Sequence, residues 1–131
     1  MPHPRVLAYR LAVVGALLAL AVLSLMPAGT VPRTELGGHG EHVFAYLGTA
    51  FLLGIGARRR MHVPLLLALV SYAGLLEILQ GWAPGRTSQA EDFVYSAVGV
   101  LLGTLVAWRM QSALRRRERQ PPLVRARVGE A

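Results

Sequence analysis

Long apolar stretches separated by short polar segments dominate the sequence, and four of them lie at residues 11–26, 43–57, 63–79 and 93–108. They are rich in Leu, Ala, Val and Gly and do not alternate with period two, so the pattern favours helices over strands. A helix needs about 20 residues to cross the hydrocarbon core of a bilayer, and each stretch reaches about that length with its neighbours. Four spans are too few to close a barrel. The sequence therefore predicts an all-α, polytopic membrane protein built as a four-transmembrane-helix bundle.

The chain has 131 residues, enough for one ordinary domain followed by a tail. The predicted transmembrane domain covers residues 1–111, with helices at about 7–27, 41–57, 62–82 and 89–110. A Ser88-x-x-Glu91 capping box marks the start of the last helix. Residues 112–131 contain scattered arginines and two adjacent prolines, a composition typical of a disordered, solvated segment.

Arginine supplies all 14 basic residues, and the formal net charge is +7. The arginines flank the apolar stretches, which indicates a membrane protein and no nucleic-acid partner. Most of them precede the first stretch, separate the second from the third, or follow the fourth; Arg33 and Arg86 alone lie in the other two loops. The positive-inside rule therefore predicts that both termini are cytoplasmic. The Arg-rich tail is expected to contact anionic lipid headgroups, or to serve only as a topology signal.

A cleaved signal peptide is the alternative interpretation of the first apolar stretch. Arg5 and Arg10 would form its basic region. The apolar run is longer than the apolar region of a signal peptide, which usually has about 7–15 residues. Met26-Pro27-Ala28 is also a poor cleavage site. We therefore expect this stretch to be a transmembrane helix.

Polar residues gather at the outward ends of the predicted helices. Ionisable residues in or beside a membrane span are costly to bury, so their presence there indicates a function. Helical spacing places His42 with Tyr46 and Glu77 with Gln80 on shared faces. A stripe of Asp92, Ser96, Gly99 and Gly103 should allow a close approach of the third helix. The predicted ligand-binding set is His42, Tyr46, Glu77, Gln80, Arg86, Asp92 and Ser96.

Two other interpretations of these residues stay open. In the first, Arg86 clamps the carboxylates, and His42, Tyr46 and Gln80 complete hydrogen bonds that only hold the helices together. In the second, His39 and His42 bind a metal with Glu77 and Asp92, but a clear third protein ligand is lacking. We therefore predict no metal and no cofactor, and the absence of cysteine excludes thiolate ligands and disulfides.

The order His42-x-x-x-Tyr46, Glu77-x-x-Gln80, Pro84-Gly85-Arg86, Asp92 and Gly99 resembles the VanZ-like family of small bacterial membrane proteins. The resemblance covers about residues 24–103. Members often carry Asp-Lys shortly before the histidine, where this chain has Gly38-His39, and Asn where it has Ser96. The family is named for a protein associated with teicoplanin resistance. The resemblance thus implies a multi-pass protein of the bacterial cytoplasmic membrane with a role in the cell envelope.

Three functions compete. The first is an accessory protein whose outward-facing site binds a lipid-linked precursor, a peptide terminus or a glycopeptide-type antibiotic, with Arg86 recognising carboxylate or phosphate. The second is a membrane-embedded enzyme that uses His42 or Asp92 as base and Glu77 as acid. The third, a proton pathway, is disfavoured because the sequence places no acid or histidine in the inner half of any span. The sequence favours the first and leaves the oligomeric state open.

Overall fold

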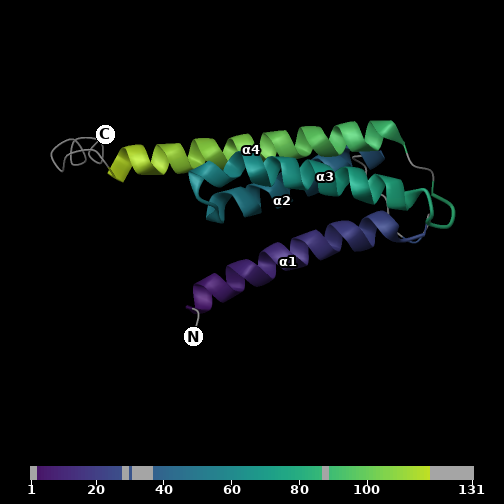
Figure 1. Cartoon of the computed structure of the whole chain (residues 1–131), viewed down its shortest axis with the longest axis horizontal. Helices are drawn as coiled ribbons and strands as arrows, with labels where there is room; N and C mark the ends of the chain where they lie inside the picture. Colours follow the sequence, from purple (N-terminus) through teal and green to yellow (C-terminus); the bar gives the residue numbers. More distant parts are fainter. Residues whose placement is uncertain (1–2, 28–29, 31–36, 87–88, 119–131) are drawn as a thin grey trace.

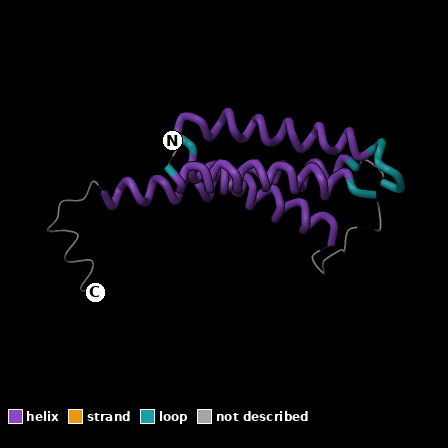
Figure 2. Tube along the Cα trace, turned by 90° about the horizontal axis from the view of Figure 1, so that it is seen from below, coloured by secondary structure: helices purple, strands orange, loops and turns teal. Residues whose placement is uncertain are grey.

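The computed structural model describes residues 3–27, 30, 37–86 and 89–118. It contains four α-helices and one short 3₁₀-helix (Figure 1): α1 (Pro4–Leu25), α2 (Gly37–Gly56), η1 (Arg59–Met61), α3 (His62–Gln80) and α4 (Ala90–Glu118). All regular structure within these described ranges is helical, which confirms the all-α part of the predicted fold class. Figure 2 shows that the helices run along a common axis and that the loops lie at their two ends.

Three of the helical segments are long and apolar enough to cross a membrane: Pro4–Leu25, Arg59–Gln80 and Ala90–Glu118. The described helix α2 does not join them, because its first turns carry His39, Glu41 and His42. A membrane-compatible helical protein is therefore established by length and composition, and the fourth span stays a prediction.

The two ends of the bundle differ in chemistry, and we name them by their residues. The histidine end holds His39 and His42, the beginnings of α2 and α4, and the end of α3. The arginine end holds Arg58–Arg60 at the start of α3 and Arg109–Arg117 at the end of α4. Each end thus draws its side chains from segments that are far apart in the sequence.

Helices α2 and α4 make the most extensive contact in the bundle, and glycine makes it possible. A β-carbon at Gly99 would strike the Val43 carbonyl oxygen, and one at Gly103 would strike that of Leu47. The glycine stripe of α4 therefore faces α2, and the expectation that it faces the third helix is wrong. The short loop between α3 and α4 suggested α3 as the partner, but only the backbone of α2 comes this close. Helix α3 instead approaches α4 through Gly74, where a β-carbon would lie 3.4 Å from Phe93.

Helix α1 is the least embedded element, and it diverges from the other helices toward its N-terminus (Figure 1). Only Leu20 and Ser24 of α1 are buried, whereas most of its apolar side chains are exposed. Two tyrosines tie it to its neighbours: the Tyr9 hydroxyl donates to the Leu53 carbonyl at 3.0 Å, and the Tyr72 hydroxyl donates to the Leu17 carbonyl at 2.8 Å. An apolar, exposed surface of this kind suits contact with lipid.

Helix boundaries differ from the predicted ones at two places that matter. Helix α2 begins at Gly37, whose φ of 71° suits glycine, so His39 lies in its first turn. Helix α4 runs to Glu118, so residues 112–118 are helical and the disorder expected for them is wrong. The Ser112 hydroxyl bonds to the Trp108 carbonyl at 2.7 Å, and arginines in the last turn offset the negative end of the helix dipole. Ser88 of the capping box and residues 119–131 lie outside the described residues.

Candidate functional site

Asp92 is the centre of a polar group at the histidine end, because it lies between two histidines of α2. Its Oδ1 accepts a hydrogen bond from Nδ1 of His39 at 3.0 Å. Its Oδ2 lies 3.8 Å from Nε2 of His42, an ion-pair separation if that ring is protonated. Nδ1 of His42 is 3.1 Å from the Ser96 hydroxyl. We call these four residues, His39, His42, Asp92 and Ser96, the histidine–aspartate cluster.

Helical spacing and the glycine contact together explain why the cluster forms. His39 and His42 are three residues apart in the first turns of α2, and Asp92 and Ser96 are four apart at the start of α4. Such pairs lie on one face of a helix. The close approach of α2 and α4 at Gly99, three residues after Ser96, then brings the two faces together. The carboxylate of Asp92 also lies in the first turn of α4, where the positive end of the helix dipole favours an anion.

The cluster opens toward solvent in a graded way. The side chain of His39 is 47% exposed, those of Asp92 and His42 are about 20% exposed, and Ser96 is buried. The Glu91 carboxylate lies 3.7 Å from Nε2 of His39 at the open side. The His39 ring stacks on Tyr95, with ring centroids 4.5 Å apart. A polar molecule can therefore reach His39 and Asp92 from outside, past a flat aromatic surface.

Tyr46 and Glu77 lie behind the cluster in the interior of the bundle. Tyr46 is only 2% exposed, and its ring lies parallel to that of His42. It shares a side-chain hydrogen bond with Ser96 and lies close enough to Tyr72 and Glu77 to interact with them electrostatically. Oε1 of buried Glu77 accepts the backbone N–H of Gln89 at 2.6 Å. Since Gln89 immediately precedes α4, this hydrogen bond joins the end of α3 to the start of α4. Glu77 thus supports the helix that carries Asp92.

Arg86 is placed away from the cluster. Its Nε donates to the Met26 carbonyl at 2.7 Å, and its terminal nitrogen donates to the Leu23 carbonyl at 2.9 Å. Both acceptors lie at the C-terminal end of α1, where carbonyls lack helical partners. Within the described part of the chain Arg86 has no carboxylate partner. Gln80 is buried near the end of α3, and no described contact connects its side chain to the cluster.

The structure thus brings together His42, Tyr46, Asp92 and Ser96 of the predicted set, with Glu77 adjacent. It adds His39, Glu91 and Tyr95, which were not among the predicted ligand-binding residues. His39, which precedes His42 by three residues, was considered only as a metal ligand, because the helix was expected to begin at residue 41. No group of three or more His, Asp or Glu side chains in the described ranges has the arrangement of a metal site.

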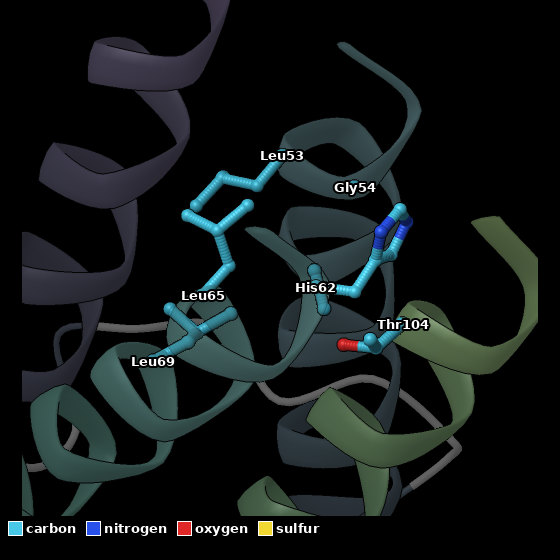
Figure 3. A pocket seen from close by; sticks show the side chains of 7 residues that line it. Leu53, Gly54, His62, Leu65, Leu69 and Thr104 are labelled. Atoms are coloured by element: carbon cyan, nitrogen blue, oxygen red, sulfur yellow. The ribbon is translucent and has the colours of Figure 1, made fainter. Parts of the chain in front are cut away.

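A buried histidine, His62, begins α3 at the arginine end. Figure 3 shows its ring beside residues of α2 and α4. Its Nδ1 donates to the Arg59 carbonyl at 3.0 Å, while Nε2 is buried with no described protein partner. The surrounding pocket, lined by residues such as Gly54, Leu65 and Thr104, leaves no room for a water molecule. The amide nitrogen of Gln111 reaches the carbonyls of Gly54, Ile55 and Ala57 nearby. These groups close the end of α2 and present no accessible site.

Comparison of the chain with protein-family models, with curated proteins and with solved structures found no match.

Proposed function

We propose that this chain is a VanZ-like protein of the bacterial cytoplasmic membrane that binds a polar cell-envelope ligand at its histidine end. The ligand is a lipid-linked precursor, a peptide terminus or a glycopeptide-type antibiotic. Its binding would serve envelope homeostasis or antibiotic resistance in an accessory role. All four long helices would span the membrane, with both termini in the cytoplasm and the histidine end facing outward.

The dimensions and charges of the helices support this topology. Helix α2 has 20 residues, which at about 1.5 Å each gives about 30 Å, the thickness of the hydrocarbon core. Tyr46, Thr49, Ala50 and Gly54 of α2 are buried within the bundle, which lowers the cost of the helix's polar content. The concentration of arginines at one end agrees with a cytoplasmic position for that end.

The observation that carries the proposed function is the position of Asp92 between two histidines, of which His39 is 47% exposed. Asp92 and Glu91 are hydrogen-bond acceptors when ionised, so they favour ligand groups that donate, such as hydroxyl or ammonium. The stack of His39 on Tyr95 offers a flat surface for a sugar or peptide group. Because the Arg86 guanidinium is occupied by carbonyls of α1, we assign recognition to the cluster and not to Arg86.

Binding by the purified full chain tests the proposal. Native mass spectrometry in detergent would compare the wild type with Asp92→Asn and His39→Ala, using an undecaprenyl-linked peptidoglycan precursor and teicoplanin as separate probes. One lost hydrogen bond to a charged group corresponds to about 10–100-fold weaker binding. His3→Ala, a histidine at the other end of the chain, is the matched control and should bind like the wild type. Equal binding by Asp92→Asn, or no binding of either probe by the wild type, would refute the assignment.

A membrane-embedded enzyme is the second candidate, and the geometry of His42 favours it specifically. Nδ1 of this ring contacts the Ser96 hydroxyl, and its Nε2 lies 3.8 Å from Asp92, close enough for the carboxylate to stabilise the ring once it has taken up a proton as a base. Glu77 would be the acid. If His42→Gln or Glu77→Gln retains the precursor but abolishes a product seen with the wild type, the chain is an enzyme. If the wild type forms no product, the binding function stands.

A further inference from the structure

A basic hollow lies at the arginine end, separate from the histidine–aspartate cluster. It has a volume of about 610 Å³ and is lined by Arg59 of η1 and by Trp108, Arg109, Ser112, Arg115 and Arg116 of α4. The residues of α4 recur at intervals of three and four, so they occupy one side of the helix. Arg59 comes from the short connection between α2 and α3 and closes the hollow from a different part of the chain.

Trp108 holds two of the arginines in position. The guanidinium carbon of Arg59 lies 4.8 Å from the centre of the Trp108 ring, and that of Arg109 lies 5.9 Å from it. A guanidinium within about 6 Å of a tryptophan ring is attracted to its face. Because Trp108 is half-buried in the bundle, it fixes both charges at the wall of the hollow.

The positive charge of the hollow is not neutralised by the described protein. The ion pairs that join two described residues all involve a histidine of the histidine end, and none of them involves an arginine of the hollow. Glu118 lies near the end of α4 but does not line the hollow. Four guanidiniums around one concave surface repel one another and favour an anion between them. Phosphate oxygens match the planar guanidinium especially well, since two parallel hydrogen bonds can form.

The level of the hollow relative to the membrane indicates which kind of molecule supplies that phosphate. Helix α4 has 29 residues, about 43 Å at 1.5 Å per residue, whereas the hydrocarbon core is about 30 Å thick. The helix is therefore longer than the hydrocarbon is thick, and its last turns, which carry Arg115, Arg116 and Arg117, belong outside the hydrocarbon. Tryptophan concentrates at the level of lipid headgroups, and basic pockets beside membrane helices at the cytoplasmic surface bind anionic headgroups.

We propose that the hollow between η1 and α4 binds the phosphodiester headgroup of an anionic membrane lipid. Arg59 and Arg109 hold the phosphate from two sides, Arg115 and Arg116 extend the site outward, and Trp108 lies beside the glycerol region. The site is built by the folded bundle, and it does not require residues 119–131. It is independent of the ligand proposed for the histidine end.

Trp108 itself provides the measurement. The chain has two tryptophans, and a Trp82→Phe background leaves Trp108 as the only indole emitter. The full chain would be reconstituted in mixed phosphatidylglycerol and phosphatidylcholine vesicles in which one lipid at a time is brominated near the headgroup. We expect brominated phosphatidylglycerol to quench Trp108 more strongly than its mole fraction predicts. Quenching that follows the mole fraction would overturn the proposal.

Two charge-matched variants separate a built site from general attraction. Arg59→Gln with Arg109→Gln removes two lining residues, while Arg60→Gln with Arg117→Gln removes two arginines of the same end that do not line the hollow. Removing one basic contact weakens association with anionic lipid about fivefold. We expect a loss of phosphatidylglycerol preference of at least about fivefold in the first variant and less than about twofold in the second. Equal losses would mean that only diffuse charge acts and would overturn the site.

Two further arms complete the test. Arg59→Lys with Arg109→Lys retains the charge and replaces the glutamine variant if that variant does not fold. It should still lose part of the phosphatidylglycerol preference, because lysine cannot form the two parallel hydrogen bonds of a guanidinium. Inorganic phosphate, compared with sodium chloride at the same ionic strength, should not displace the lipid. Displacement by millimolar phosphate would assign the hollow to a soluble phosphate compound and overturn the lipid assignment.

Discussion

Replacing Arg86 by alanine should loosen the end of α1 and leave the histidine–aspartate cluster intact. The reason begins with the sequence at the end of that helix. The Leu23 carbonyl would normally accept the N–H of the residue four positions later, but that residue is Pro27, which has none. The terminal nitrogen of Arg86 donates to this carbonyl at 2.9 Å, and its Nε donates to Met26 at 2.7 Å. Arg86 thus supplies donors that α1 cannot supply itself.

The expected magnitude follows from these two hydrogen bonds. A hydrogen bond to a charged group contributes about 1.5–3 kcal/mol when it is buried. Because Arg86 is only half-buried and one of its bonds is exposed, we reduce the combined value to about 1–2 kcal/mol. Such a loss raises the local opening equilibrium of the last turn of α1 by about 5–30-fold. Arg86→Lys keeps the charge but not the fork of donors, so it should give an intermediate effect.

Hydrogen–deuterium exchange with peptide-level mass spectrometry, performed on the purified chain in detergent, measures this opening directly. In Arg86→Ala, amides near Ser24 should exchange faster, whereas those of α4 should keep their protection. Arg60→Ala, an arginine at the opposite end, should leave α1 unchanged. If Arg86→Ala preserved the protection of α1 but abolished ligand binding, the capping role would be refuted and Arg86 would belong to the binding site.

Two other predictions concern packing. Gly99→Ala should destabilise the chain by about 1–3 kcal/mol in a detergent unfolding titration, because its β-carbon would strike the Val43 carbonyl; Gly48→Ala, where nothing lies within 4 Å, should be neutral or slightly stabilising. Equal effects of the two substitutions would contradict the close α2–α4 contact. His62→Leu should change the free energy of unfolding by about 1 kcal/mol or less, since it removes both the hydrogen bond to Arg59 and an unpartnered buried nitrogen. A far larger loss would show that the nitrogen has a partner.

The helices could be predicted from the sequence because their apolar stretches are long and their composition is uniform. The wrong predictions concern where individual helices begin and end. The tail was judged by its arginines and prolines, yet residues 112–118 continue α4, whose preceding turns are already fixed by packing against α2. Helix α2 was expected to begin after Gly40, because glycine weakens helices; the structure begins it at Gly37 and so brings His39 into the first turn.

The candidate site was predictable to the extent that spacing along a helix decides it. His42, Asp92 and Ser96 were identified as polar residues at one end, and they meet. Which helices touch could not be derived from spacing, so the glycine stripe was assigned to the wrong neighbour. Arg86 shows the same limit. A guanidinium near two acids suggests an ion pair, but only the three-dimensional structure shows that Arg86 reaches the carbonyls of Met26 and Leu23 instead.

The attachment of α1 has a consequence for how freely this helix can vary. At Leu17, Leu23 and Met26 the groups that receive hydrogen bonds from Tyr72 and Arg86 are main-chain carbonyls, which are the same whatever residue carries them. Apolar side chains along most of α1 can therefore be exchanged for one another without loss of these anchors. The restriction falls on Tyr9 within α1, on the donors Tyr72 and Arg86 in other elements, and on Pro27, which cannot donate to the Leu23 carbonyl. Apart from Tyr9, the substitution-sensitive positions of this attachment therefore lie outside the helix that it holds.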